Sequence, residues 1–150
     1  MRQIRYIYLH CSASEWGDAD EIRKWHTDPK PKGEGWQDIG YHYVILNAYP
    51  DKASMEMKKP QVYQDGEIEK GRPVAEQGAH ALDYNKGSLG ICLIGLNSFT
   101  GMQLLSLRGL LLELLVDYPD AKIRGHYEVD PNKTCPNINM DYLRGWLRAM

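Results

Sequence analysis

The sequence predicts an α/β fold, a single domain with a central mixed β-sheet flanked by helices. Strand-like segments and segments of helical spacing follow one another along the 150 residues, as in sheets that pack against helices. Residues 88–95 are almost entirely apolar, which is typical of a strand covered on both faces. A chain of this length corresponds to about one domain. Because the sequence also contains no internal repeat, we expect residues 1–150 to form one domain.

The chain begins with a strand and a helix. Residues 4–10 are rich in β-branched and aromatic side chains, which favours a strand in the interior of the sheet. The alternation of a strand then places His10 and Cys11 on opposite faces. Acidic capping residues and helical spacing of the apolar side chains predict a short helix over residues 18–26. The prolines and glycines of residues 28–35 end this helix.

A second strand is predicted over residues 41–46. In this strand Tyr41 and Tyr43 share one face, and His42 lies on the other. The charged run 47–60 has no clear period, and we interpret it as a surface excursion.

The segment 61–72 is interpreted as a β-hairpin. Its arms are Val62-Tyr63 and Glu67-Ile68, and the dipeptide Asp65-Gly66 between them is the one that a type I′ turn favours.

The C-terminal half contains the longest predicted helix. Thr100 caps this helix, which runs to Tyr118. Its core face consists of Leu104, Leu107, Leu111, Leu114 and Leu115. Residues 122–124 predict a short strand, and Asn139 caps a last helix. The buried side of that helix consists of Leu143, Trp146 and Leu147.

The most reactive stretch of the sequence is the loop of residues 124–136. It places an imidazole, an ammonium and a thiol close together, at His126, Lys133 and Cys135. Two prolines fix the backbone torsion angle φ on either side of Lys133 and Cys135. A zinc centre that keeps an open position uses three protein ligands, and His126 and Cys135 are suitable for two of them. The third must come from another segment.

His10 is a candidate for the third ligand. It ends a predicted strand, His126 follows another, and strand ends in α/β folds meet at one rim of the sheet. The alternative is a structural role for these side chains, and composition and spacing alone leave both interpretations open. Cys11 is a rival sulfur ligand. Because the strand alternation turns it away from His10, we interpret it as a small buried core residue.

Composition argues against several classes of partner. The formal net charge is −2 and no run of Lys and Arg is longer than a pair, so we expect neither nucleic acid nor an anionic membrane surface as ligand. Three cysteines suit a reducing compartment or metal ligation better than a secreted disulfide scaffold. No stretch is long enough to span a bilayer, and residues 1–5 lack the features of a signal peptide. We therefore expect no membrane insertion.

Several motifs occur in the same order as in one known family. They are His10-Cys11-Ser12-Ala13, Glu21-Ile22-Arg23-Lys24-Trp25-His26, Trp36-Gln37-Asp38-Ile39-Gly40-Tyr41-His42-Tyr43, Gly78-Ala79-His80, Tyr84-Asn85, Ser88 to Gly95, Gly125-His126 and Lys133-Thr134-Cys135-Pro136. With these motifs the chain resembles, over most of its length, the phage-lysozyme-like N-acetylmuramoyl-L-alanine amidases, the family shared with peptidoglycan recognition proteins. The chain departs from the family in a longer segment 47–60 and in one extra residue between His126 and Cys135.

The resemblance implies one Zn²⁺ per chain and the hydrolysis of peptidoglycan, at the amide bond between the lactyl group of muramic acid and L-alanine. The implied zinc ligands are His10, His126 and Cys135. Tyr41 and Lys133 are implied as catalytic residues. Lys133 would stabilise the oxyanion, and Tyr41 would assist proton transfer or hold the attacking water. His80 is carried over as a substrate-binding residue of the groove.

The resemblance and the lack of a signal peptide together indicate a phage or prophage endolysin. We expect it to stay in the cytoplasm until lysis, to depend on a holin-like partner for passage, and to act on the cell wall as a monomer without a separate wall-binding domain. Two alternatives remain open: a peptidoglycan-binding module without catalysis, and a cysteine hydrolase that uses Cys11 or Cys135 with a histidine. The presence of Cys135 favours an enzyme, because non-catalytic relatives typically lack that cysteine.

Overall fold

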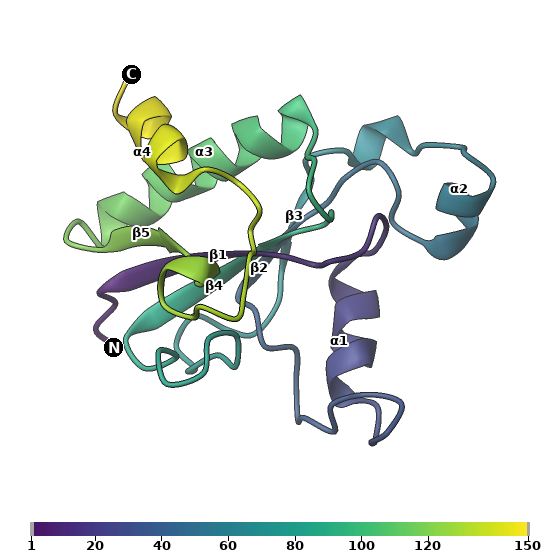
Figure 1. Ribbon diagram of the computed structural model, residues 1–150, viewed down its shortest axis with the longest axis horizontal. Coiled ribbons are helices and arrows are strands. Elements are labelled where there is room, and N and C mark those ends of the chain that lie inside the picture. Colours follow the sequence, from purple (N-terminus) through teal and green to yellow (C-terminus); the bar gives the residue numbers. More distant parts are fainter. Residues whose placement is uncertain (1, 150) are drawn as a thin grey trace.

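Residues 2–149, which the computed structural model describes, contain a five-stranded sheet with the order β3-β2-β4-β1-β5 (Figure 1). The strands are β1 (Tyr6–Cys11), β2 (Tyr43–Ile45), β3 (Ile68–Lys70), β4 (Ser88–Leu93) and β5 (Lys122–Gly125). β1 is parallel to β4 and β5, β2 is parallel to β4, and β3 is antiparallel to β2. The predicted α/β fold with a mixed sheet is therefore confirmed. β1 has a neighbour on each side, as predicted for an interior strand.

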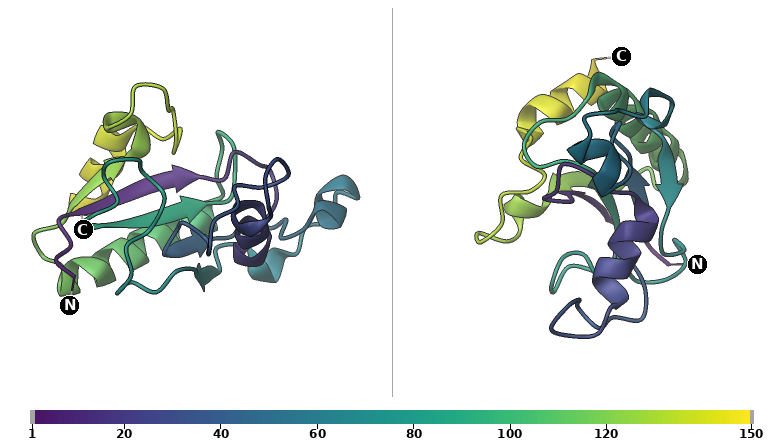
Figure 2. Two further views of the ribbon diagram at one scale, coloured as in Figure 1. Left: turned by 90° about the horizontal axis from the view of Figure 1, so that it is seen from below. Right: turned by 90° about the vertical axis from the view of Figure 1, so that its right-hand side faces the viewer.

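The helices of the described residues are α1 (Ala19–Thr27), α2 (Lys52–Glu56), η1 (Val62–Gln64), α3 (Gly101–Asp117), η2 (His126–Glu128) and α4 (Met140–Arg148), where η marks a 3₁₀ helix. α3 and α4 lie side by side on one face of the sheet, and α1 lies on the other (Figure 2). The side chains of Asp18, Thr100 and Asn139 cap α1, α3 and α4, as predicted. Between residues 2 and 149, the helices are too short or too polar to cross a membrane.

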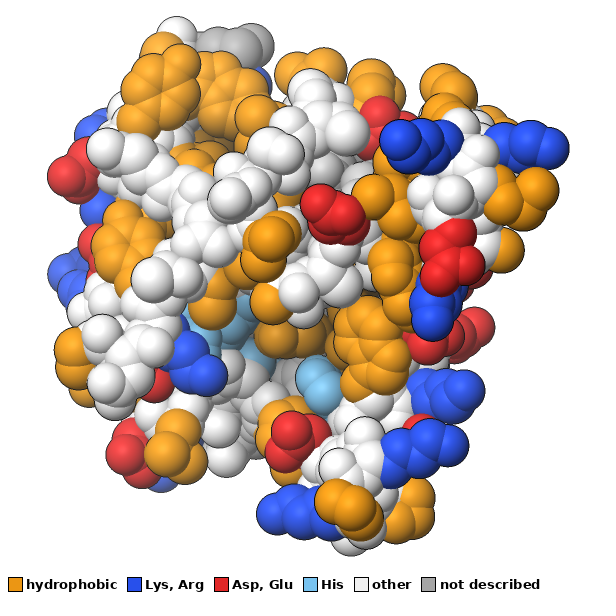
Figure 3. All heavy atoms as spheres, turned by 45° about the vertical axis from the view of Figure 1, so that its right-hand side comes forward, with side chains coloured by type: hydrophobic (Ala, Val, Ile, Leu, Met, Phe, Trp, Pro, Cys, Tyr) orange, Lys and Arg blue, Asp and Glu red, His pale blue; other side chains and the backbone are white. Residues whose placement is uncertain are grey.

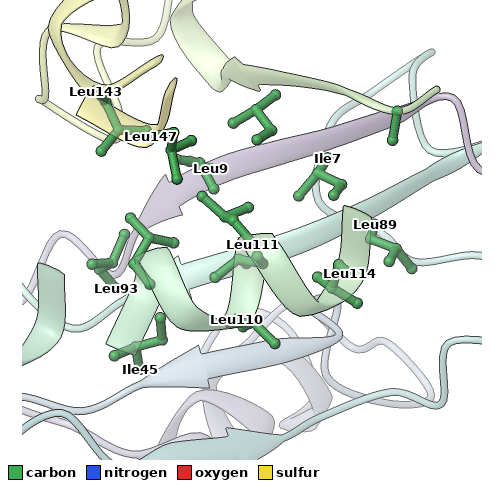
Figure 4. Close-up of a cluster of buried hydrophobic side chains, with 14 of the residues drawn as sticks. Ile7, Leu9, Ile45, Leu89, Leu93, Leu110, Leu111, Leu114, Leu143 and Leu147 are labelled. Carbon is green, nitrogen blue, oxygen red and sulfur yellow. The ribbon is translucent and has the colours of Figure 1, made fainter. Parts of the chain in front are cut away.

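Apolar side chains cover both faces of the sheet. The larger cluster joins the sheet to α3 and α4 and includes Ile7, Leu9 and Leu111, none of which has exposed surface (Figure 4). The smaller cluster joins the other face to α1 and includes Ile22 and Val44. All six residues of β4 are buried, as predicted for a strand covered on both faces. Close packing on both faces restricts the movement of β1 and β4, so side chains at the ends of these strands have fixed positions.

Tyr41 and His42 do not belong to a regular strand, because β2 begins only at Tyr43. The expectation that Tyr41 and Tyr43 share a face is wrong: Tyr41 packs against the α1 cluster and Tyr43 against the α3 cluster. The reason lies in the backbone. The carbonyl groups of Tyr41 and His42 accept hydrogen bonds from the consecutive residues Arg72 and Gly71, so both face the same neighbouring segment and the two-residue alternation is interrupted.

The predicted hairpin of residues 61–72 is also wrong. Val62 and Tyr63 belong to η1 and are 72% and 79% exposed, so neither side chain packs into the core. β3 pairs with β2 instead and so extends the sheet by one strand. Asp65-Gly66 does form a turn, closed by a hydrogen bond from Glu67 N–H to the carbonyl oxygen of Gln64. Asp65 has φ −64° and ψ 119° and Gly66 has φ 85°, which is a type II turn rather than type I′.

The surface excursion of residues 47–60 contains the short helix α2. The carboxylate of Asp51 accepts a hydrogen bond from the backbone N–H of Ser54 and caps it. Five residues are too few to show helical periodicity, which is why the sequence pattern did not predict this helix.

Candidate metal centre

Three metal-binding side chains converge at the carboxyl ends of β1 and β5. His10 is the next-to-last residue of β1, His126 begins η2 directly after β5, and Cys135 comes from the loop before α4. One ligand atom of each side chain lies within 4.8 Å of the other two. Within residues 2–149 this is the one cluster of His, Cys, Asp or Glu side chains with such spacing. The structure thus brings together the three residues that the sequence pointed to.

The spacing of these atoms fits a tetrahedral metal ion. Cys135 Sγ lies 3.6 Å from His126 Nδ1. Two ligands at the usual zinc–nitrogen and zinc–sulfur bond lengths and a tetrahedral angle would be separated by about 3.6 Å as well. His10 and His126 are nearly without exposed surface, and their ring centroids are 4.6 Å apart. Two imidazoles and one thiolate form a donor set that suits Zn²⁺ and leaves a fourth position open.

The charge states of the three side chains favour metal binding. A hydrogen bond from the Cys11 thiol is the largest cause that lowers the pKa of Cys135, and hydrogen bonds with His10 and His126 lower it further. Burial lowers the pKa of His10 to about 4, so its imidazole is neutral at physiological pH. A thiolate and a neutral imidazole are the forms that bind a metal ion.

The loop that carries Cys135 is tied to η2 by its backbone. Tyr127 N–H donates a hydrogen bond to the carbonyl oxygen of Cys135, at 3.0 Å, and Asp130 N–H donates one to that of His126, at 3.1 Å. The carboxylate of Asp130 faces His126, with 3.9 Å between Oδ2 and Nε2. The carboxylate therefore lies on the side of the ring that is turned away from Cys135, where it favours a proton on Nε2 and leaves Nδ1 free.

Cys11 is a buried core residue, as predicted, and its sulfur is not one of the three clustered ligand atoms. It nevertheless lines the same cavity as His10 and Cys135. The carboxamide of Asn137 donates to the carbonyl oxygen of Leu96 at 2.6 Å and points its nitrogen at Cys11 Sγ at 3.7 Å. Strand alternation predicts the direction of a side chain within the sheet. At the carboxyl end of β1, however, both His10 and Cys11 line the cavity.

Tyr41 and Lys133 lie beside the cluster. The ring centroids of Tyr41 and His10 are 5.1 Å apart. Burial raises the pKa of the Tyr41 hydroxyl well above its usual value, so this group stays protonated and acts as a hydrogen-bond donor. Lys133 is exposed and lines the cavity, and its positive charge contributes to the lowered pKa of His10.

The cluster opens into a cavity of about 490 Å³. Figure 3 shows histidine side chains at the bottom of a hollow on this face of the molecule. Two residues that the sequence did not assign to the site, His26 and Trp36, also line it, with ring centroids 4.7 Å apart. His26 Nδ1 accepts a hydrogen bond from Gly40 N–H, which joins α1 to the segment before Tyr41. Trp36 lies in an irregular loop, so no periodicity could have indicated its position.

His80 lines the same cavity but is buried, and its ring contacts His10. A larger hollow of about 780 Å³ lies elsewhere, between α3, β5 and α4. It does not include His10, His126 or Cys135, so volume does not identify the chemical site in this molecule.

Comparisons with known proteins extend over nearly the whole chain. The family described as N-acetylmuramoyl-L-alanine amidase matches residues 1–138. The chain is similar to the endolysin of Escherichia phage T7, with 37% identity over 93% of this chain and 83% of that protein. It is also similar to the endolysin of Klebsiella phage KP32, with 35% identity over 97% and 87% of the two chains. A solved structure, the N-acetylmuramoyl-L-alanine amidase LysC from Clostridium intestinale URNW, has a TM-score of 0.77 and 25% identity, and covers 99% of this chain and 88% of that one.

Proposed function

Because the chain belongs to the N-acetylmuramoyl-L-alanine amidase family, we propose that it is a zinc-dependent endolysin that cleaves peptidoglycan between the lactyl group of muramic acid and L-alanine. The observation that carries the zinc part of this proposal is the convergence of His10, His126 and Cys135. These two nitrogens and one sulfur would hold one Zn²⁺ per chain. When bound, the ion would act as a Lewis acid and lower the pKa of a water molecule to about 7.

The residues around the cluster have distinct roles in this proposal. Lys133 places a positive charge beside the site, where it would stabilise negative charge that develops on the carbonyl oxygen of the substrate. The neutral Tyr41 hydroxyl would donate a hydrogen bond to the attacking water or to the reacting amide. Because His10 and His126 are buried, the low polarity around them would strengthen both interactions.

The cavity has the properties of a groove for a glycopeptide. His26 and Trp36 offer flat ring surfaces beside Tyr41, and Lys133 and Asn132 offer polar groups on the opposite loop. We include in the proposal that the chain works as one catalytic domain and as a monomer. The support for one domain is a single sheet with a packed cluster on each face.

The similarity to phage endolysins also supports a proposed route to the substrate. The protein would be stored in the cytoplasm of the host and would reach the cell wall at lysis, with a holin-like protein permeabilising the membrane.

A cysteine hydrolase is the second candidate function. The observation that favours it is the distance of 3.6 Å between Cys135 Sγ and His126 Nδ1 together with the lowered pKa of the Cys135 thiol. The two candidates differ in their inhibitors. A chelator should abolish the activity of a zinc amidase and added Zn²⁺ should restore it, whereas a thiol enzyme should retain its activity in the chelator.

The decisive experiment is mass spectrometry of digested peptidoglycan, with wild type and Cys135→Ser. We expect the wild type to release free peptide stems and to leave the glycan strands intact, and we expect Cys135→Ser to release none while it keeps its fold. Cleaved glycan bonds would contradict the amidase proposal. Binding of muropeptides without release of stems, even with Zn²⁺ supplied, would identify a peptidoglycan-binding module instead.

A further inference from the structure

His80 lies directly behind His10, and both nitrogens of its ring have partners inside the protein. Its Nδ1 is 3.0 Å from His10 Nε2, and its Nε2 is 3.4 Å from Ser88 Oγ. His80 is 8% exposed, and Ser88 has no exposed surface. The two ring nitrogens are therefore occupied by protein groups, although the edge of the ring lines the cavity.

The protonation state of this chain of groups follows from the backbone at its far end. The Ser88 hydroxyl has one proton, and its nearest acceptors are the carbonyl oxygens of Tyr84 at 2.8 Å and Asn85 at 3.1 Å. A hydroxyl that donates to a carbonyl group is left with lone pairs and accepts the proton of His80 Nε2–H. In this arrangement a neutral His80 ring has its one proton on Nε2. His80 Nδ1 then has a lone pair and accepts from His10 Nε2–H.

The ring of His80 is held firmly in this orientation. The backbone N–H groups of His80 and Ala81 both donate to Asn85 Oδ1, each at 2.8 Å. Gly90 of β4 faces the ring, and a Cβ atom built at that position would lie 2.5 Å from His80 Cγ. Any side chain larger than that of glycine at position 90 would push the ring away from His10.

We propose that Ser88 and His80 are positioning residues that fix the Nε2–H tautomer of His10 and so present His10 Nδ1 to the metal ion. This inference rests on the proposed zinc amidase function. In this proposal His80 orients the metal ligand His10, in addition to the substrate contact that the family resemblance implies. A hydrogen bond of this kind orients the ring of a metal ligand and typically changes metal affinity by about 10–100-fold. His126 has a separate partner for its Nε2, the carboxylate of Asp130.

Two substitutions of His80 separate the hydrogen bond from the volume of the side chain. His80→Phe keeps a flat ring but removes the acceptor, whereas His80→Asn places a carboxamide oxygen near the position of Nδ1. We expect His80→Phe to lower the affinity for Zn²⁺ by about 10–100-fold, measured by competition with a fluorescent chelator, and His80→Asn to restore most of it. His26→Phe is the matched control, because it makes the same exchange in the same cavity outside the His10–His80–Ser88 chain, and we expect its affinity for Zn²⁺ to stay near that of the wild type.

Nuclear magnetic resonance of the histidine rings tests the tautomer without any measurement of activity. In metal-free, ¹⁵N-labelled wild type, we expect His10 to carry its proton on Nε2 and to show scalar coupling to His80 Nδ1 across the hydrogen bond. Ser88→Ala preserves the volume of His80 but removes the acceptor of its Nε2–H. We expect this variant to contain a mixture of His10 tautomers, and this result would support the proposal even if His80→Phe fails to fold.

The proposal is wrong if His10 carries its proton on Nδ1 in the metal-free wild type. It is also wrong if His80→Asn loses as much Zn²⁺ affinity as His80→Phe while both remain folded. These outcomes are separate from the proposed function. A wild type that binds Zn²⁺ and shows the His10–His80 coupling but releases no peptide stems would overturn the amidase proposal and leave the positioning role supported.

Discussion

His42 is a buried histidine whose two ring nitrogens have opposite roles. Its Nδ1 accepts a hydrogen bond from Gly90 N–H at 3.0 Å, and its Nε2 faces the carbonyl oxygen of Glu76 at 2.8 Å and so carries the proton. A second proton, on Nδ1, would point at the N–H of Gly90 and break that hydrogen bond. It would also place a positive charge beside Arg2, whose Nη2 is 3.3 Å from His42 Nε2. Burial is the largest cause that lowers the pKa of His42 to about 4.

This lowered pKa predicts that acid destabilises the protein through His42. The folded chain has a pKa of about 4 at this residue and the unfolded chain about 6.5, so the unfolded state binds more protons between these values. The contribution of His42 to the free energy of unfolding is fully present above pH 6.5 and decreases as the pH falls toward 4, by about 3 kcal/mol in all. Urea unfolding of the metal-free protein at a series of pH values measures this loss.

His42→Gln is the variant that isolates the effect, because glutamine does not titrate and its amide can still donate to the carbonyl oxygen of Glu76. His10 and His80 also have lowered pKa values, and they titrate in both proteins. We therefore expect the wild type to lose more stability than His42→Gln as the pH falls. Parallel curves of unfolding free energy against pH would show that His42 is not the group responsible.

Single residues also show what the sequence could and could not predict about the site. His10, His126 and Cys135 were found because histidine and cysteine are scarce and because their neighbours form motifs. The burial of Cys11 was predicted, but its place in the wall of the cavity was not, because residues far away in the sequence, such as Asn137, complete that wall. The hydrogen bond between His80 and His10 joins residues 70 positions apart and leaves no periodic signal in the sequence.

At the level of elements, Arg144 joins α4 to the two elements that position His126. Its guanidinium donates to both carboxylate oxygens of Glu128 in η2, at 2.7 and 3.0 Å, and to the carbonyl oxygen of Ile123 in β5, at 3.0 Å. Glu128 in turn accepts from Gly125 N–H at 2.9 Å. The hydrogen bond with Arg144 is the largest cause that lowers the pKa of Glu128. β5 lies at the edge of the sheet, and this pair satisfies backbone groups on its open side.

We predict that Arg144→Lys destabilises the protein by about 1 kcal/mol, although it preserves the charge. A lysine ammonium cannot form the two parallel hydrogen bonds to Glu128 and the third bond to Ile123 at the same time. The expected loss is modest, because both side chains are about one quarter exposed and water screens the pair. Chemical unfolding of the two proteins gives the difference in unfolding free energy.

Lys52→Gln serves as the control for that measurement. It removes an exposed ion pair between Lys52 and Glu56, with 3.7 Å between the charged atoms, and should change the stability by less than about 0.5 kcal/mol. An Arg144→Lys variant as stable as Lys52→Gln would mean that the geometry of the Arg144–Glu128 pair does not matter.

The elements that the sequence predicted well are those with a local signal. β1, β4 and α3 have apolar patterns and caps of their own, and each was predicted within one or two residues of its ends. The sequence did predict a strand at Glu67-Ile68, which overlaps β3, but paired it with Val62-Tyr63, because its actual partner β2 lies more than 20 residues earlier in the chain. The turn at Asp65-Gly66 was predicted at the right position, but its type depends on the torsion angles of Asp65, which the packing around it decides.

On the scale of the whole molecule, one sheet connects two packed layers. α3 and α4 cover one face and α1 the other, and the strands between them contribute side chains to both clusters. Leu93 of β4 belongs to the first cluster and its neighbour Cys92 to the second. The same strands pack against both layers, so neither layer can stay folded once the sheet is lost. We therefore propose that the chain is one domain that unfolds cooperatively.

We predict a single unfolding transition in urea in which probes of the two layers coincide. Far-ultraviolet circular dichroism reports mainly on α3 and α4, which contain more helical residues than α1. Tryptophan fluorescence reports mainly on the other layer, because Trp25 of α1 packs against Trp16 and the ring of Trp36 packs against His26 of the same helix. Equal midpoints and equal slopes from the two probes are expected for one cooperative unit. A fluorescence transition that precedes the loss of helix would show that the α1 layer unfolds on its own. Because this layer carries His26, Trp36 and Tyr41, it would also show that one wall of the cavity can open without global unfolding.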